Sequence, residues 1–512
     1  MVMSKRAVEE TVEEFFPDFA RQRDLATELD KWVDVKNETP SMPKDRFTEE
    51  YATLQEVSKT PWARLIVTEV AQSLFVDGYR HSSEAENSPA WDRIWQPNGN
   101  DARQIAVHRG ALNHGLSYVI SLPGVGPDGK EMSVTRGVSA KKGIALYRDD
   151  PLDPEDEWPM LFLHVDRVRV PGAHGPIYRI RYVDEEHIYT VDYDPEDTGR
   201  FTYVSHTAHG TGVVPVIRFA NMLDLDGESM GEIEPVLPLL RRIDQDAFDR
   251  LIIQRYQSWQ IRTATGMEKP KSEAEAQAMA MKMRVNDLLM AENPEARFGT
   301  LPATSMAGLI DARDSDIRDL AAVTQTPPHH LLGLSPNVSA EGLVEAQASL
   351  MRKIEERKES FGDSWERVIR LAAHQMGMKA EAEDFSAEIR WRDTESRSLN
   401  QVADALGKMA KLLGVPVQML WERIPDWTDQ DTERAMKLLQ DDSSEQELLR
   451  RLTAGATMGD LAAEGQISTG AAETTTPGST GVLGDPDSPE RKAANRKRGG
   501  YGADWDGDGK PG

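Results

Sequence analysis

Apolar residues recur at helical spacing on both sides of a central stretch that is broken by proline and glycine. The first set is Met306, Leu309, Ile310, Ile317, Leu320 and Val323. This spacing predicts a helix with one buried stripe. The second set is Leu343, Leu350, Ile354, Phe361, Trp365 and Val368. It predicts a helix that begins near Ser339, a suitable N-cap, and runs to about Gly377, several times the usual helix length.

The stretch between these two helices is predicted to be a loop. Its residues are Pro327, Pro328, His329, His330, Leu331, Leu332, Gly333, Leu334, Ser335, Pro336, Asn337, Val338 and Ser339. Thr326 is followed by two prolines, which lack an amide donor and restrict the residue before them, so the first helix ends there. The paired histidines could bind zinc, but no third and fourth ligand follows at a recognisable spacing.

The pattern changes several times along the rest of the chain. Residues 1–85 are predicted to be helical, with Val8, Val12, Phe15, Phe16 and Phe19 on one face, and helical spacing resumes from Ile105 to Leu116. Short β-prone runs follow at 118–122, 133–135, 161–165, 178–182, 188–191 and 201–204, and they predict a small antiparallel sheet. Beyond Gly231 a stripe of Val236, Leu239, Leu240, Ile243, Ala247 and Leu251 predicts another helix.

The C-terminal half contains an insert, a strand and a tail of different composition. Residues 266–302 are rich in Ala, Met and charge, with a possible helix at 273–283 and possible strands at 287–290 and 296–300. A strand-like run at 387–391 precedes further helices at 398–452. After about Gly465 aliphatic residues almost vanish, so we expect the tail to be disordered.

Composition excludes several classes of protein. The 512 residues suggest about three domains. The net charge of -26 argues against tight, sequence-independent wrapping of nucleic acid, which requires Lys and Arg to displace counterions. The chain has no cysteine, so it holds no disulfide or thiolate metal site. Since no apolar run approaches the ~20 residues of a membrane span, we expect a soluble protein without a signal peptide.

The helix–loop–helix resembles the stem, tunnel loop and spine of tailed-phage portal proteins. The residues that carry the resemblance are Ile317, Leu320, Ala321, Thr324, Thr326-Pro327, Leu332-Gly333, Asn337, Ser339-Ala340, Leu343 and Phe361 with Trp365. Upstream, Val214–Asn221, Gly227-Glu228-Ser229 and a helix beginning near Ile233 extend it. The order of these segments is more specific than any one of them, and the resemblance covers roughly residues 90–440.

This resemblance implies an α+β, mainly helical portal fold. Its parts are an N-terminal wing with a small antiparallel sheet (1–230), a first stem helix (231–265), a clip (266–303), a second stem helix (304–326), a tunnel loop (327–339), a spine helix and wing return (340–394), a helical crown (395–465) and a disordered tail (466–512). The cationic residues assigned to the clip are Lys269, Lys271, Lys282, Arg284 and Arg297.

The resemblance also implies a function without catalysis, metal or cofactor. A homododecameric ring would form a channel at one capsid vertex, through which double-stranded DNA passes without sequence recognition during packaging and ejection. Its expected partners are the terminase large subunit, scaffold and major capsid protein, and a head–tail connector. The protein would be assembled in the host cytoplasm, would reside in the virion and would have no membrane partner. His329 and His330 would then face the channel, and an ordinary polar loop is the equally open alternative.

Three other short segments resemble ligand-binding motifs, and each has a simpler structural interpretation. Gly124–Glu131 nearly spells a phosphate-binding loop, but Glu131 stands where Ser or Thr must hold magnesium, and a hairpin turn is favoured. Asp504–Gly509 supplies only half of a calcium loop, and the basic cluster Arg491–Arg498 could touch DNA or belong to a solvated tail. A nucleotide hydrolase that uses the Gly124 loop, or a capsid morphogenesis protein without a channel, therefore remain the alternative functions.

Overall fold

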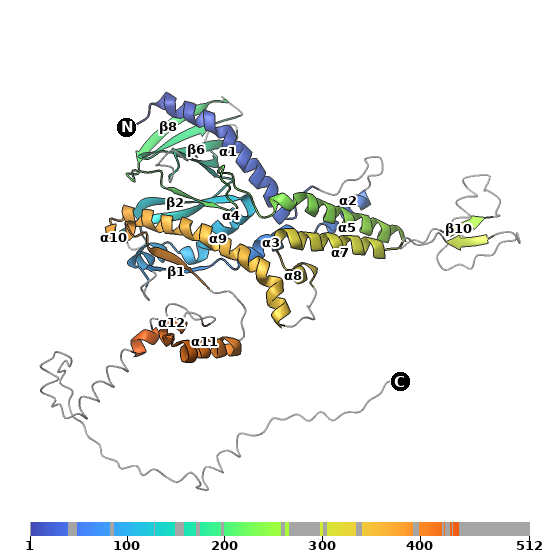
Figure 1. Ribbon diagram of the computed structural model, residues 1–512. Coiled ribbons are helices and arrows are strands. Elements are labelled where there is room, and N and C mark those ends of the chain that lie inside the picture. Colours follow the sequence, from blue (N-terminus) through green and yellow to red (C-terminus); the bar gives the residue numbers. More distant parts are fainter. Residues whose placement is uncertain are drawn as a thin grey trace, which may run out of the picture. The chain divides into compact units, whose positions relative to one another are not determined.

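The structure mixes helices with antiparallel strands, as the sequence predicts (Figure 1). The computed structural model describes residues 2–38, 49–81, 87–126, 129–148, 158–169, 175–195, 199–257, 262–265, 297–300, 305–333, 340–392, 399–421, 424, 431–432 and 434–439. The chain divides into two compact units, Met1–Met436 and Lys437–Gly512, and the elements below belong to the first. Among the helices described, none combines the length and apolar character that a membrane span needs.

The first helix packs against a five-stranded antiparallel sheet. α1 (Lys5–Val33) begins at Ser4, whose Oγ accepts a hydrogen bond from the Ala7 amide at 3.2 Å. Val8, Val12 and Phe19, which the pattern places on one face, are buried in a cluster with the strands. The strands, in spatial order, are β4 (Gly143–Leu146), β5 (Leu161–Val168), β6 (Ile177–Val183), β7 (His187–Tyr193) and β8 (Phe201–Ala208).

A second, three-stranded sheet carries two helices on one face. Its order is β3 (Glu131–Ser139), β2 (Leu116–Val125) and β9 (Val216–Ala220), all antiparallel. Both α4 (Asn100–His114) and α9 (Ala340–Gln375) pack against it (Figure 1). Ser117 and Ser121 of β2 bond to residues of α4 and α9 respectively, so both helices cover the same face. The single small sheet expected from the sequence is therefore two sheets, because strands β4 to β8 pair only with one another, whereas β9 returns to pair with β2.

The N-terminal region is less helical than expected. After α2 (Glu49–Ser58) and α3 (Trp62–Ala71), Val76–His81 forms strand β1 within the stretch predicted to be helical. It pairs with β12 (Ala387–Trp391), the strand-like run that the sequence did predict. A π-helical turn at Trp91–Trp95 then leads into α4.

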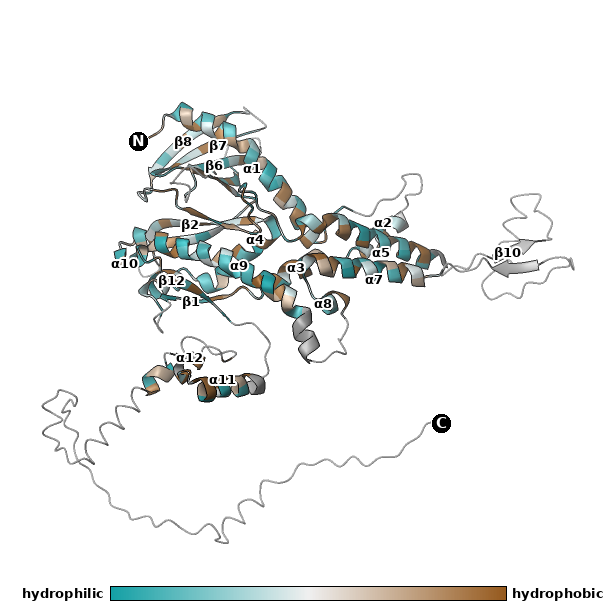
Figure 2. Cartoon of the chain, viewed as in Figure 1, coloured by the Kyte–Doolittle hydropathy of each residue, from teal (hydrophilic) through white to brown (hydrophobic). Residues whose placement is uncertain are grey.

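Two long helices lie side by side and lead to a pair of short strands (Figure 1). They are α5 (Leu237–Gln257), which follows a 3-10 turn at Glu234–Val236, and α7 (Ala307–Thr324). Arg242 on α5 binds Asp316 on α7 with two hydrogen bonds of 2.8 and 2.7 Å. Hydrophobic residues appear at intervals along both helices rather than over their whole surface (Figure 2).

The helix predicted for 231–265 ends earlier than expected. Arg262–Thr265 is strand β10, paired antiparallel with β11 (Arg297–Thr300), which falls on a predicted strand. Threonines at alternate positions of β10 and a partner strand explain the difference, since β-branched residues favour strands.

The apolar stripe of α7 is only partly buried. Ile317 and Leu320 are 1% and 0% exposed, as predicted. Ile310 and Val323 are instead 44% and 63% exposed, so the expectation of one continuous buried stripe is wrong for them. Helical spacing shows which residues share a face but not whether a neighbour covers that face within one chain.

The longest helix agrees closely with the sequence. α9 spans 36 residues, and Leu350, Ile354, Phe361, Trp365 and Val368 are all buried on it. The side chain of Leu343 lies outside those described. Short helices α10 (Lys379–Ala382), α11 (Leu399–Leu413) and α12 (Val417–Trp421) follow.

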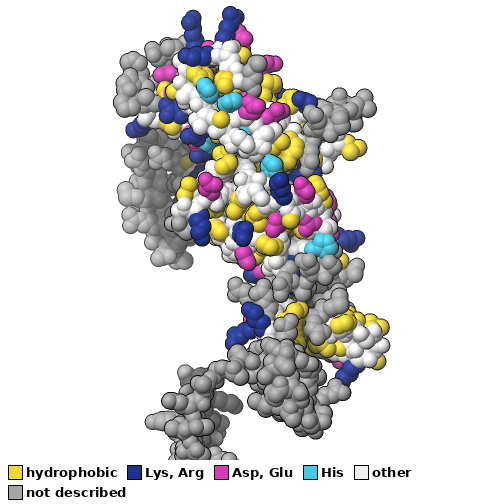
Figure 3. Space-filling view, turned by 90° about the vertical axis from the view of Figure 1, so that its left-hand side faces the viewer, with side chains coloured by type: hydrophobic (Ala, Val, Ile, Leu, Met, Phe, Trp, Pro, Cys, Tyr) yellow, Lys and Arg dark blue, Asp and Glu magenta, His cyan; other side chains and the backbone are white. Residues whose placement is uncertain are grey.

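Charge is mixed on the face drawn in Figure 3. Among the residues coloured there, Lys and Arg alternate with Asp and Glu. The net charge of -26 is therefore not concentrated into one acidic field on that visible face.

Candidate channel segment

The junction after α7 is held by local hydrogen bonds. Gln325 adopts a left-handed conformation with φ of 56°, and its amide and that of Thr326 bond back to α7 carbonyls. The Thr324 hydroxyl donates to the Leu320 carbonyl at 2.7 Å, and its oxygen lies 3.1 Å from the Thr326 hydroxyl, from which it can accept. Thr324 and Thr326 are buried, so the helix end is fixed rather than frayed.

Five of the thirteen residues of the expected loop form a short helix. α8 (Pro328–Leu332) has proline at its first turn and ends at Gly333, whose φ is 63°. The prediction of an irregular loop throughout is therefore wrong for this part, because proline is tolerated at a helix start, where an amide donor is not needed. Leu331 is 4% exposed and belongs to the main hydrophobic core, so its side chain anchors α8 to that core.

The two histidines of α8 lie against each other and against α3. Their ring centroids are 4.4 Å apart. His330 Nδ1 lies 3.2 Å from a carboxylate oxygen of Glu69, without the geometry of a hydrogen bond. Partial burial, and then the neighbouring His330, lower the pKa of His329. In the part of the chain that the structure describes, the two imidazoles and the one carboxylate do not form a group that could hold a metal ion.

A buried ion-pair cluster ties the α7 end to α9. Lys353 Nζ donates to the Thr324 carbonyl at 3.0 Å and lies 2.5 Å from Glu232 Oε2. Arg357 Nε donates to Glu232 Oε1 at 3.1 Å. The three charged side chains are between 4% and 6% exposed. A cation at a helix C-terminus is favourable, so Lys353 fixes the end of α7 against the long helix.

The other predicted site residues lie outside the described residues. They are Leu334, Ser335, Pro336, Asn337, Val338 and Ser339 of the tunnel loop and Lys269, Lys271, Lys282 and Arg284 of the clip. Arg297 is in β11, where its backbone pairs with Thr265. The calcium-like string at 504–509, the basic cluster at 491–498 and the tail at 466–512 also lie outside.

The Gly124 string forms a hairpin, as favoured from the sequence. Gly124 is within β2, and Glu131 begins β3 opposite Val125. The Gly126 amide donates to the Lys130 carbonyl at 2.8 Å, and Gly129 has a φ of 78°. A strand follows the turn where a phosphate loop needs a helix N-terminus, so this segment cannot cradle a nucleotide in that way.

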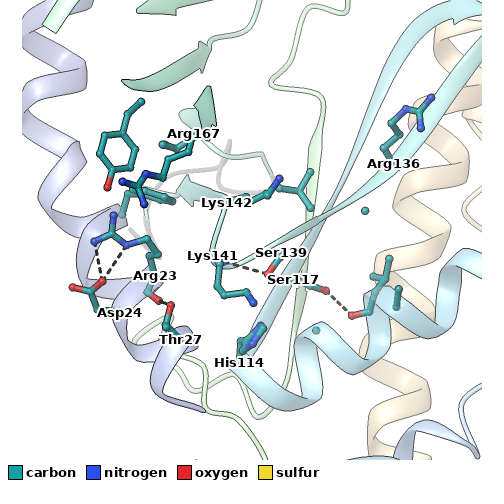
Figure 4. Close-up of a pocket in the computed structure, with 18 of the residues that line it drawn as sticks. Arg23, Asp24, Thr27, His114, Ser117, Arg136, Ser139, Lys141, Lys142 and Arg167 are labelled. Carbon is teal, nitrogen blue, oxygen red and sulfur yellow. Dashed lines mark hydrogen bonds and ion pairs between the residues drawn. The ribbon is translucent and has the colours of Figure 1, made fainter. Parts of the chain in front are cut away.

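The sequence analysis missed a basic groove. Its cavity of about 980 Å³ is lined by α1, α4, the end of β3, the turn before β4, and residues of β5 and β6 (Figure 4). The cationic side chains on it are Arg23, Arg103, Arg136, Lys141, Lys142 and Arg167. They come from segments far apart in the chain, so no local motif marks them. Within the described residues, three or more His, Cys, Asp or Glu side chains never gather as a metal site.

The protein thus mixes helices and strands. Two long helices, α5 and α7, lie side by side, and the end of α7 is bonded to the longer helix α9. A family model described as phage portal protein, SPP1 Gp6-like, matches residues 13–448, and the chain belongs to this family. Proteins of this family are structural components of the virion.

Two named relatives are portal proteins of mycobacteriophages. The chain is 26% identical over 371 residues to the portal protein of Mycobacterium phage D29, covering 68% of this chain and 72% of that one. It is also 26% identical over 378 residues to the portal protein of Mycobacterium phage L5, covering 69% and 73%. A chain in the neck of a native GTA particle superposes with a TM-score of 0.45 at 11% identity, covering 72% of this chain and 94% of that chain.

Proposed function

We propose that this portal protein forms a ring-shaped channel of twelve subunits through which the phage genome is packaged and ejected. The observation that carries the proposal is the family match over residues 13–448, which includes every element from the sheets to the helix junction. The fixed junction supports it further. Thr324, Thr326 and Leu331 anchor α8 to the core, as a segment beside moving DNA would require.

The paired long helices suit a ring of identical subunits. A ring closes through two different, complementary faces on each subunit. Ile310 and Val323 are exposed on α7 in a single chain and would be covered by a neighbour. In this assignment α5 and α7 are the stems, α9 is the spine, residues 327–339 form the tunnel loop, residues 266–303 form the clip, and residues 395–465 form the crown.

The partners follow from that assignment. Double-stranded DNA would pass without sequence recognition, and the net charge of -26 would let phosphates slide rather than bind. The terminase large subunit, a head–tail connector, scaffold and major capsid protein would contact the ring from outside. Assembly would take place in the host cytoplasm.

Electron microscopy tests this function most directly. Negative-stain images of the purified protein should show rings with a central hole. A nucleotide hydrolase should turn over ATP without forming rings, and Lys130→Ala should abolish that turnover. The portal function predicts that Lys130→Ala packages DNA normally, since Lys130 belongs to the β2–β3 hairpin. A capsid protein without a channel should neither form rings with a central hole nor hydrolyse ATP.

A further inference from the structure

The basic groove carries more positive charge than its own carboxylates balance. Arg23 pairs with Asp24 at 2.8 Å, Lys142 pairs with Asp166 at 3.0 Å, and Lys141 pairs with Asp30. Within the described residues, Arg103, Arg136 and Arg167 have no carboxylate partner: Arg103 reaches the Thr135 carbonyl, and Arg167 stacks on Tyr178. In a chain with a net charge of -26, such a group of cations selects an acidic ligand.

The wall of the groove is rigid. His114 Nε2 lies 2.7 Å from Asp30, and the same carboxylate accepts from Lys141 and from the Asn113 amide nitrogen. Although burial opposes the effect, the hydrogen bonds of His114 and Lys141 to this carboxylate lower the pKa of Asp30 to about 2. Lys141 is therefore held in place before any ligand arrives, which reduces the entropy cost of binding.

The floor of the groove is apolar. Phe19, Val107, Val138, Val165 and Tyr178 line it between the charged residues. Figure 4 shows Arg23 and Arg167 on one side of the cavity and Arg136 on the other. An apolar floor with a cationic rim fits a peptide that presents a hydrophobic side chain between acids better than it fits a bare inorganic anion.

The chain presents such a peptide on a different surface. In the turn after β9, Leu225 is 105% exposed and stands between Asp224 and Asp226, with Glu228 two residues further on. Within the described residues, no Lys or Arg side chain pairs with these three acids. This acidic leucine turn, residues 223–228, is thus an unsatisfied counterpart of the groove.

The acidic leucine turn is also preorganised. The Asp224 carboxylate accepts from the amides of Asp226 at 3.0 Å and Glu228 at 2.9 Å. Gly227 has a φ of 80°, and its carbonyl accepts from Arg218 at 3.4 Å. Leu225 is therefore fixed at the tip of an ordered turn, so docking would cost little conformational entropy.

The two surfaces lie at opposite edges of one sheet. The groove uses Arg136–Ser139 of β3, and the acidic leucine turn follows β9, in a sheet of order β3-β2-β9. A surface and its complement on opposite edges produce a head-to-tail contact, which gives a ring when the rotation between subunits closes. We propose that the acidic leucine turn of one subunit docks into the basic groove of the next, with Leu225 on the apolar floor.

This inference rests on the proposed ring, and cysteine cross-linking tests both separately. The chain has no cysteine, so Leu225→Cys and Ala106→Cys, an exposed position in the groove, introduce the only thiols. Under mild oxidation, the double variant should give a ladder of linked subunits. Each single variant alone should give none, and a mixture of the two single variants should give dimers only. Arg109→Cys, exposed on α4 but outside the groove, should not cross-link with Leu225→Cys.

A charge swap provides an independent measurement. Arg136→Glu should raise the concentration needed for assembly by about tenfold or more, because like charges would face each other. Asp226→Arg in the same chain should restore assembly. Arg109→Glu, with the same change in charge outside the groove, should have little effect. Leu225→Ser should weaken assembly without changing the unfolding of the single chain, since Leu225 is fully exposed.

Each result is decisive. Rings without cross-links, or a charge swap that does not restore assembly, would overturn the docking and leave the channel function standing. Cross-linked open chains without rings would support the docking and overturn the channel function. A wild-type chain that forms no rings, together with a double cysteine variant that forms no cross-links, would overturn both.

Discussion

The indole N–H of Trp365 donates a hydrogen bond of 2.8 Å to Nε2 of His108, joining α9 to α4 inside the core. Nδ1 of the same imidazole lies 3.1 Å from the Leu74 carbonyl, and the His108 ring stacks on Phe361 at 5.3 Å. An indole can only donate and a carbonyl can only accept, so His108 must be neutral with its proton on Nδ1. Burial lowers its pKa to about 4.

This neutral histidine predicts a specific loss of stability in acid. The folded pKa of about 4 lies below the unfolded value of 6.5, so its contribution is complete above pH 6.5 and is lost as the pH falls toward 4. A shift of this size corresponds to about 3 kcal/mol. His108→Gln, which stays neutral, should remove that part of the pH dependence. Urea unfolding of both proteins at pH 7 and pH 4 measures this loss. If the free energy of unfolding changed equally with pH in both proteins, the prediction would be contradicted.

The ion-pair cluster at Glu232 predicts a large cost for one small change. Glu232→Gln leaves Lys353 and Arg357 buried without their shared carboxylate, and breaking such a pair costs about 3–5 kcal/mol. The urea midpoint should fall accordingly. Glu355→Gln is the matched control, because Glu355 pairs with Lys358 while 61% exposed and should change stability little. Similar midpoints for the two variants would show that burial does not strengthen the cluster.

Two glycines predict opposite effects of the same substitution. A Cβ on Gly231 would lie 2.3 Å from the Asn113 carbonyl oxygen, so Gly231→Ala must displace backbone and destabilise the protein. A Cβ on Gly308, in helix α7, meets nothing within 4 Å. Gly308→Ala should therefore stabilise by about 0.5–1 kcal/mol. Thermal melting of the two variants distinguishes the cases, and a stable Gly231→Ala would refute the close contact.

His329 is the better probe of the proposed channel, because His330 is engaged with Glu69. His329→Asp adds one negative charge per subunit beside the translocating polyanion, whereas His329→Asn adds none. The Asp variant should shorten or slow DNA packaging, while both variants should form normal rings. Packaged DNA length and electron microscopy provide the two measurements. Normal packaging by the Asp variant would place His329 away from the channel.

The helix faces could be predicted because their signal is local. Ile354, Phe361 and Trp365 lie one or two turns apart, and each is buried on α9. The pairing of β1 with β12 could not be predicted, because Tyr79 and Ile389 are partners across most of the chain. A six-residue strand that needs such a distant partner has no periodicity of its own strong enough to reveal it.

The candidate site was predicted less completely than the fold. The end of α7 at Pro327 and Pro328 was correct, but the same prolines also begin α8, which the loop interpretation overlooked. The groove depends on Arg23, Arg136 and Arg167, which meet only after two sheets and two helices have packed. Tertiary contacts of this kind leave no trace in local spacing.

The pairing of Arg262–Thr265 with Arg297–Thr300 has a consequence for how such proteins diverge. The two strands form a neck that holds the ends of the intervening sequence next to each other. Evolution can therefore lengthen, shorten or exchange the stretch from 266 to 296 without shifting the register of α5 against α7. Changes in the length of that stretch are in this way separated from the packing of the rest of the molecule.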